Sequence, residues 1–213
     1  MTDLYAELRL VAGNVSRETF EALCAFEQRF RTWNARINLV SRSTLEHFWS
    51  RHILDSAQLF TLAPAATAWM DIGAGGGFPG LVIALLLRDR PNAQITLIES
   101  NRKKAAFLQA MVGEFDLPAR IHAVRIEELS IDSVYAEIVT ARALADLNLL
   151  LKLAHPWLGA GARGLFHKGR DYRSEIEESA HHWRYDLIQH ASVTDPQSVV
   201  LEISRLQSRQ EST

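Results

Sequence analysis

The chain has 213 residues, 47% of them hydrophobic, and a formal net charge of −2. This length fills one core but is short for two independently folded domains, and the near-neutral charge argues against a protein that holds nucleic acid with cations spread over its whole surface. The longest strongly apolar run, residues 81–87, is far shorter than the roughly 20 residues that cross a bilayer, and the single cysteine cannot form an internal disulfide, so we expect a soluble, cytoplasmic protein that binds no membrane.

The N-terminal region, residues 4–60, has the apolar spacing of amphipathic helices. Phe20, Leu23, Phe26, Phe30 and Trp33 recur at the three-to-four spacing that places side chains on one face of a helix. We therefore predict an N-terminal helical extension over residues 1–62 that packs on the rest of the protein.

One helix of this extension is expected to begin near residue 43. Ser43 and Glu46 have the spacing of a capping box, in which the hydroxyl and the carboxylate accept hydrogen bonds from free backbone N–H groups. A helix that begins here contains Arg51, His52 and Asp55.

From residue 68 onward, short apolar strands alternate with helical segments, which is typical of a mostly parallel sheet covered by helices on both faces. The expected strands span residues 68–72, 94–99, 120–125, 137–141, 163–167, 185–192 and 199–204, and the helices between the earlier strands span 79–88, 101–112 and 147–158. The last two strands look like a hairpin, which adds an antiparallel edge strand. We predict one sheet domain over residues 63–207, followed by a flexible tail over 208–213.

A glycine-rich segment, residues 71–80, follows the first expected strand directly. Gly75, Gly77 and Gly80 match the pattern G-x-G-x-x-G, and Pro79 suits the first turn of the next helix. Glycines allow a ligand to approach the backbone closely, and the free N–H groups of a helix start can bind it. The loop therefore predicts a nucleotide-like ligand, although such a turn can also be purely structural.

Glu99 ends the second expected strand at the position where a carboxylate accepts hydrogen bonds from the ribose hydroxyls of an adenosine. A dinucleotide and S-adenosylmethionine share this arrangement. Asp71, directly before the loop, would repel a pyrophosphate but suits a ligand with positive charge on its amino acid and sulfonium. We therefore interpret the chain as a Rossmann-like class I methyltransferase with a seven-stranded sheet, with a nicotinamide enzyme as the alternative.

Several segments resemble those of one family, the bacterial 16S ribosomal RNA guanine-N7 methyltransferases called RsmG or GidB. These segments are Trp33-Asn34, Asn38-Leu39-Val40, Arg51-His52-Ile53-Leu54-Asp55-Ser56, the loop 71–80, Glu99-Ser100 with Arg102-Lys103, Arg125-Ile126-Glu127-Glu128 and Thr140-Ala141-Arg142-Ala143. The resemblance covers nearly the whole chain. It implies methyl transfer from S-adenosylmethionine to N7 of the guanine at position 527 in the usual 16S numbering.

Carried over by motif, the cofactor contacts would include Gly73 and Phe78 in the loop, Ile126 and Glu127 after the third strand, and Arg142 after the fourth. Together with Asp71, Gly75, Gly77 and Glu99, these residues form the expected cofactor site. For Ile126 and Glu127, the structural alternative is a helix start rich in Glu, which the helix dipole favours without any ligand.

Guanine N7 has a lone pair and no proton, so its methylation needs no general base, and catalysis reduces to alignment of the reacting atoms in a site that excludes water. The resemblance places Arg142 where this fold faces the target base, and we predict it as the catalytic residue, with contact to O6, a phosphate or the cofactor. The alternative is a surface arginine paired with Asp146.

Basic residues near the predicted cleft are candidates for RNA contact, because a target base is splayed out and gripped by its backbone. The candidates are Arg51, His52, Lys103, Lys168 and Arg170. The alternatives are solvated helix faces and, for Arg51 and His52, a structural pairing with Asp55. The histidines lack ligand-like spacing, so we predict no metal.

The expected partner is 16S rRNA or the small ribosomal subunit, with no DNA and a monomeric enzyme. The near-neutral charge favours a ribosomal particle over naked RNA. Two other functions stay open: a methyltransferase of this fold that acts on a small molecule or a protein, and a non-catalytic, cofactor-binding ribosome-assembly factor.

Overall fold

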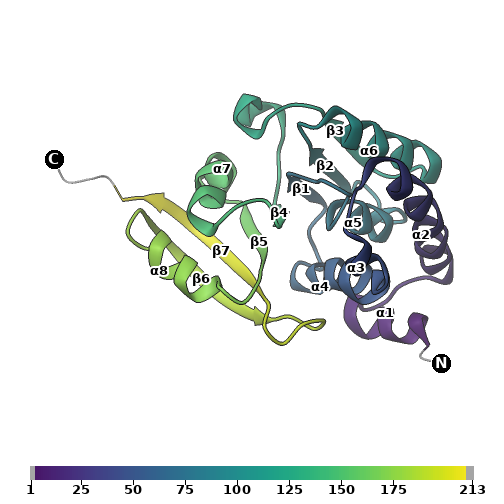
Figure 1. Cartoon of the computed structure of the whole chain (residues 1–213). Helices are drawn as coiled ribbons and strands as arrows, with labels where there is room; N and C mark the ends of the chain where they lie inside the picture. Colours follow the sequence, from purple (N-terminus) through teal and green to yellow (C-terminus); the bar gives the residue numbers. More distant parts are fainter. Residues whose placement is uncertain (1–2, 210–213) are drawn as a thin grey trace.

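The computed structural model describes residues 3–209 (Figure 1). Its N-terminal part is helical, as predicted. The helices are α1 (Leu4–Ala12), α2 (Arg17–Ile37), the short α3 (Arg42–Leu45), a π-helical turn η1 (Trp49–Leu54) and α4 (Asp55–Leu62), which continues η1 directly. Among the described residues, no helix is long and apolar enough to span a membrane.

One seven-stranded sheet forms the centre of the molecule. Its strands are β1 (Ala68–Ile72), β2 (Gln94–Ile98), β3 (Ala119–His122), β4 (Ile138–Arg142), β5 (Arg163–Lys168), β6 (Trp183–Ala191) and β7 (Val199–Ser208), in the order β3-β2-β1-β4-β5-β7-β6. The first five strands are parallel, whereas β7 is antiparallel to both β5 and β6. This arrangement confirms the predicted Rossmann-like fold with its antiparallel edge.

Four longer helices cover the sheet, together with two 3₁₀ turns. They are α5 (Gly80–Leu87), α6 (Arg102–Phe115), α7 (Leu147–Gly159) and α8 (Tyr172–Ser179), with η2 (Ile126–Glu128) and η3 (Ile131–Ser133). The strand order reverses between β1 and β4, because β2 and β3 lie on one side and β5 on the other. In open parallel sheets, ligands bind outside the carboxyl ends of the strands at such a point.

The N-terminal helices bury aromatic side chains against the same face of the sheet as α5 and α6 (Figure 1). Phe26, Phe30 and Phe48 are almost fully buried and contact Phe78 of the glycine-rich loop, while Phe30 also contacts Phe107 of α6 at a centroid distance of 5.7 Å. A second core, on the other face, joins α7 to β7. The N-terminal layer thus forms one wall of the glycine-rich loop.

Several local expectations differ from the structure. The helix expected from residue 43 is divided, because α3 ends at Leu45 and Arg51, His52 and Asp55 lie in η1 and α4. Ser41, not Ser43, caps α3, since its hydroxyl accepts from the Thr44 N–H. The short, polar helix α8 was not predicted, because its sequence has little apolar periodicity. The tail predicted over 208–213 is wrong at Ser208, which belongs to β7, and residues 210–213 lie outside the described part of the chain.

Candidate active site

The glycine-rich loop is tied to the sheet by Asp71, the fourth residue of β1. Its carboxylate accepts hydrogen bonds from the Gly80 N–H at 3.0 Å and from the Thr140 hydroxyl at 2.9 Å. A Cβ at Gly80 would lie 2.6 Å from Oδ2 of Asp71, so only glycine allows this contact. Asp71 is 1% exposed, and burial raises its pKa to about 7. It therefore shapes the loop from beneath, rather than presenting a charge toward a ligand as we expected.

Glu99 lies at the carboxyl end of β2, where it meets the other end of the loop. One carboxylate oxygen accepts from the Gly75 N–H and the other from the Asn101 N–H, both at 2.7 Å. Each oxygen has two acceptor sites, so both can still accept a hydroxyl. Gly73 and Gly75 adopt positive φ angles of 70° and 55°, which bring the backbone over this carboxylate. Gly77 lies in the same loop, with a φ of 84°.

Phe78, also in the loop, is buried and faces the N-terminal helices. Its ring stacks on His52 of η1 at a centroid distance of 4.6 Å. The Arg142 guanidinium makes a cation–π contact with the same ring, 5.1 Å from its centroid. The Phe78 side chain is therefore part of the core, and its contact with a cofactor stays a prediction.

Arg142 ends β4 and joins the sheet to the N-terminal layer. Its Nη1 donates to the Arg51 carbonyl at 2.7 Å and to Asp55 at 3.1 Å, and its Nη2 donates to Nδ1 of His52 at 2.9 Å. The alternative pairing with Asp146 is wrong, since Asp146 caps α7 through the Leu149 N–H.

His52 is uncharged in this position. It is 4% exposed, and burial together with the neighbouring Arg142 lowers its pKa to about 3. Its expected role as a cation for RNA phosphates is therefore inconsistent with the structure. Arg51 does reach the surface, where it pairs with Asp195 of the β6–β7 turn at 2.9 Å, and not with Asp55 as the structural alternative proposed.

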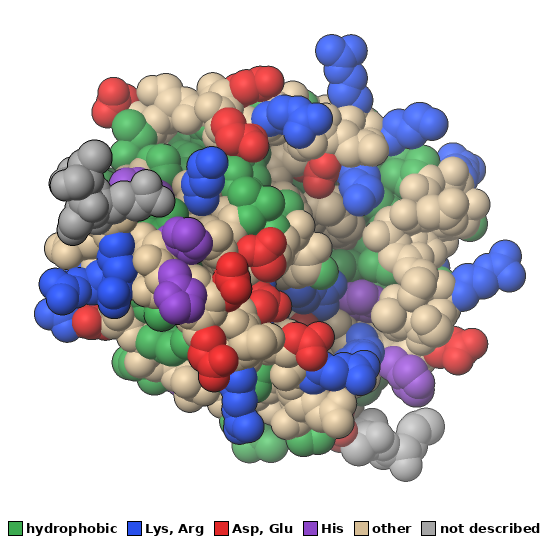
Figure 2. All heavy atoms as spheres, turned by 60° about the vertical axis from the view of Figure 1, so that its left-hand side comes forward, with side chains coloured by type: hydrophobic (Ala, Val, Ile, Leu, Met, Phe, Trp, Pro, Cys, Tyr) green, Lys and Arg blue, Asp and Glu red, His purple; other side chains and the backbone are tan. Residues whose placement is uncertain are grey.

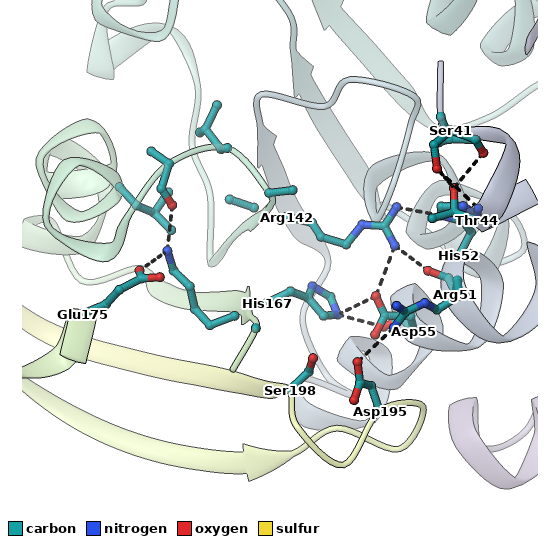
Figure 3. Close-up of a pocket in the computed structure, with 18 residues that line it drawn as sticks. Ser41, Thr44, Arg51, His52, Asp55, Arg142, His167, Glu175, Asp195 and Ser198 are labelled. Atoms are coloured by element: carbon teal, nitrogen blue, oxygen red, sulfur yellow. Dashed lines mark hydrogen bonds and ion pairs between the residues drawn. The ribbon is translucent and has the colours of Figure 1, made fainter. Parts of the chain in front are cut away.

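A pocket of about 510 Å³ opens at the carboxyl ends of β4 and β5 (Figure 3). Its walls come from η1, from the segment that follows each of these strands, and from the β6–β7 turn. The labelled lining residues in Figure 3 are Ser41, Thr44, Arg51, His52, Asp55, Arg142, His167, Glu175, Asp195 and Ser198. The pocket adjoins the glycine-rich loop, because Leu144 lines the pocket and would lie 2.5 Å from a Cβ at Gly73.

A model of the GidB family, described as rRNA small subunit methyltransferase G, matches residues 19–202. The chain belongs to this family. It is 55% identical over 206 residues to the "Ribosomal RNA small subunit methyltransferase G" of Chelativorans sp., covering 97% of this chain and 98% of that protein. It is 52% identical to the protein of the same name from Brucella canis, covering 96% of each.

Solved structures share the fold of this GidB-family chain at much lower identity. "Cofactor-bound Rv0187 from MTB" is 14% identical with a TM-score of 0.58, covering 95% of this chain and 96% of that one. A mutant of MtNAS in complex with S-adenosylmethionine is 13% identical with a TM-score of 0.56, covering 92% and 77%. These likenesses concern the fold alone.

Four other predicted residues of this GidB-family member do not line the pocket. Ile126 and Glu127 begin η2, directly after β3, with Ile126 half-buried and Glu127 exposed. Lys103 is exposed in the first turn of α6, and Arg170 is exposed in the turn before α8.

Lys168 differs from the solvent-facing cation that we expected for RNA contact. It is 7% exposed, and its ammonium donates to the Ala145 carbonyl at 2.7 Å and to Glu175 of α8 at 2.6 Å. Glu175 also accepts from the Leu147 N–H, at the start of α7. In this structure, Lys168 therefore fixes the pocket wall and has no free charge for a phosphate.

Two residues of the site were missed by the sequence analysis. The Thr140 hydroxyl donates a hydrogen bond to Asp71. Pairing of β1 with β4 in the register that sets Asp71 beside Thr140 could have indicated this contact. His167 lines the pocket and donates from Nε2 to the Asp55 carbonyl at 2.8 Å, while burial lowers its pKa. No sequence signal distinguishes His167 from the other histidines, because its partner lies 112 positions away.

Proposed function

We propose that this chain transfers a methyl group from S-adenosylmethionine to N7 of a guanine in 16S rRNA, the guanine at position 527 in the usual numbering. The observation that carries the proposal is a cofactor-type loop beside a separate pocket of about 510 Å³, at the switch point of the sheet. Membership of the GidB family and relatives named as ribosomal RNA methyltransferases support the RNA substrate.

S-adenosylmethionine would be held by residues around the glycine-rich loop. Both Glu99 oxygens have remaining acceptor sites for ribose hydroxyls, and the positive φ angles of Gly73, Gly75 and Gly77 shape the loop that would hold the ligand. Ile126 would pack on the adenine and Glu127 would accept from it. When bound, the cofactor supplies a methyl group activated by the positive sulfonium.

The neighbouring pocket would receive the guanine. Its volume lies within the range of about 300–1,000 Å³ that is common for small-ligand sites. N7 attacks the methyl carbon with its own lone pair, so the protein only has to orient the base and exclude water. Burial lowers the pKa of both His52 and His167, which makes them weak bases, as suits a reaction that needs no proton transfer.

Arg142 would orient the guanine. Its guanidinium has five N–H groups, of which three donate within the protein, so donors remain for O6 of the base. A donor to N7 itself would block the attacking lone pair, which is why we assign Arg142 to O6, to a phosphate or to the cofactor.

The RNA would approach as part of the small ribosomal subunit, in the cytoplasm, with the enzyme as a monomer. Lys103 and Arg170 are exposed cations available for its phosphates, and Arg51, also exposed, could bind one in place of Asp195. Figure 2 shows acidic side chains near the middle of one face and Lys and Arg side chains toward its margins. With a net charge of −2, the enzyme has only a few cations for RNA phosphates. A ribosomal particle could add contacts through its own proteins.

The test is incubation of the protein with radiolabelled S-adenosylmethionine and small subunits from a strain that lacks this methylation. We expect label at a single guanine, and cleavage chemistry specific for N7-methylguanine should map it. Ribonuclease treatment of the substrate beforehand should abolish incorporation. Label that survives ribonuclease would favour a protein substrate, and no label at any guanine N7 would refute the proposal.

A further inference from the structure

A second hollow lies on the N-terminal layer, beside the pocket proposed to receive the guanine, which we call the base pocket. It has a volume of about 530 Å³ and is formed by the end of α2, the connection to α3 and α3 itself. We call it the α2–α3 groove, defined by Arg31, Asn38, Ser41 and Arg42. Val40 and Ser41 line both this groove and the base pocket, so the two hollows share one wall.

We propose that the α2–α3 groove binds the single-stranded RNA next to the methylated nucleotide, an inference that rests on the proposed function. A base that enters the pocket must leave its stack, and its neighbours then continue along the protein surface. Figure 3 shows Ser41 and Thr44 at the opposite end of the pocket from Glu175. A strand that leaves the pocket past Ser41 enters the groove directly.

The charge of the groove suits a phosphate. Arg42 is exposed and, within residues 3–209, forms no ion pair, so its guanidinium is free to bind. The lining residues described for the groove include no carboxylate. Arg31 is balanced by Glu27, whose carboxylate accepts from it at 2.7 Å. The C-terminus of α2 contributes a partial negative charge of about one half to the groove. The full positive charge of Arg42 exceeds it, so the groove is positive overall.

Hydrogen bonds hold the walls of the groove in place, which favours a specific contact over a diffuse one. The Asn34 side chain accepts from the Val40 N–H at 2.8 Å, and Nη2 of Arg31 donates to the Leu45 carbonyl at 3.0 Å. Asn38, in the left-handed conformation with a φ of 50°, ends α2 with its amide exposed. The amide can donate to and accept from base edges or ribose, while Arg42 binds the phosphate.

The kinetic test compares Arg42→Ala with Arg184→Ala, which removes the same charge from an exposed residue of β6, the edge strand of the sheet (Figure 1). With small subunits as substrate, Arg42→Ala should raise KM by roughly 3-fold to 10-fold, leave kcat within about twofold, and reduce the slope of log affinity against log salt by about 0.7. Arg184→Ala should change none of these. Equal KM and salt slope in the two variants would overturn the proposal.

A binding test separates the groove from the reaction. An aryl azide attached at Asn38→Cys, in a Cys24→Ala background, should crosslink to 16S rRNA when the protein is bound to small subunits, even if no methyl group is transferred. Crosslinks to a ribosomal protein alone would overturn the proposal and assign the groove to a protein partner. Failure of methylation with a retained RNA crosslink would refute the proposed function but support the groove.

Discussion

Arg142 connects parts of the chain that are about ninety positions apart: it ends β4 and donates to three groups of η1 and α4. Only a planar guanidinium presents several donors in the fork that Arg51, His52 and Asp55 require. Its side chain is 18% exposed, so these bonds form at the edge of the pocket, where a substrate could still reach the remaining donors.

Replacing Arg142 with Lys should therefore impair both stability and catalysis. A single ammonium keeps the charge but cannot satisfy the three acceptors, so we expect a loss of about 1–3 kcal/mol in the free energy of unfolding and a fall in kcat of at least roughly 10-fold. Urea denaturation and methylation kinetics measure the two effects. Arg163→Lys, at the half-exposed pair with Glu202, is the control and should cost less than about 1 kcal/mol. Wild-type kcat in Arg142→Lys would contradict the assigned role.

Asp71 makes stability depend on pH. Burial raises its pKa from 3.8 to about 7, so the folded state holds the proton more tightly than the unfolded chain. The stability that Asp71 contributes is complete below pH 3.8 and is lost as the pH rises through about 7.

Asp71→Asn keeps the shape of the side chain but does not titrate. Relative to this variant, the wild-type protein should lose stability between about pH 4 and pH 8, by up to about 1.4 kcal/mol per pH unit. Urea denaturation of both proteins across this range measures the difference. A difference that stays constant with pH would show that Asp71 is ionised throughout.

At the scale of elements, the turn from β1 into α5 depends on the absence of a side chain at Gly80. Gly80→Ala should cost about 1–3 kcal/mol, because its Cβ would press on Asp71 and Leu97. It should also weaken S-adenosylmethionine binding, since the loop must move. Calorimetry and denaturation measure both quantities.

Gly113→Ala in α6 is the matched control for Gly80→Ala. Its Cβ would meet nothing within 4 Å, and alanine favours a helix interior, so this variant should be more stable by up to about 1 kcal/mol. Equal effects of the two substitutions would mean that the turn tolerates a side chain.

Buried, apolar elements were predicted better from the sequence than exposed, polar ones. β1 was predicted with correct bounds, since all five of its residues are buried, four of them are apolar, and Ile72 directly precedes Gly73. α8 was missed, because it is held by contacts such as Glu175 with Lys168 rather than by an apolar stripe. The cap of α3 was shifted by two residues, since Ser41 and Ser43 are chemically equivalent and only the path of the chain selects between them.

At the scale of the whole molecule, we propose that the predicted boundary between residues 62 and 63 does not separate independent folding units. Phe26, Phe30 and Phe48 share one core with Phe78 and Phe107, so removal of the N-terminal layer would expose large apolar surfaces. The fragment 63–209 should lack cooperative thermal unfolding and bind a hydrophobic dye, whereas the full chain should unfold in one transition. A fragment with a sharp transition of its own would contradict this expectation.

The sequence by itself determined the fold class, the glycine-rich loop with Glu99, and the family, because periodicity, glycine spacing and motifs depend on residues that are close along the chain. Only the tertiary structure decided the roles of Asp71, His52 and Lys168, which depend on burial and on partners from distant segments. Charged and polar side chains look alike in sequence whether they face solvent or a core. Desolvation and long-range pairing, which set their charge and their availability, arise only when the chain is folded.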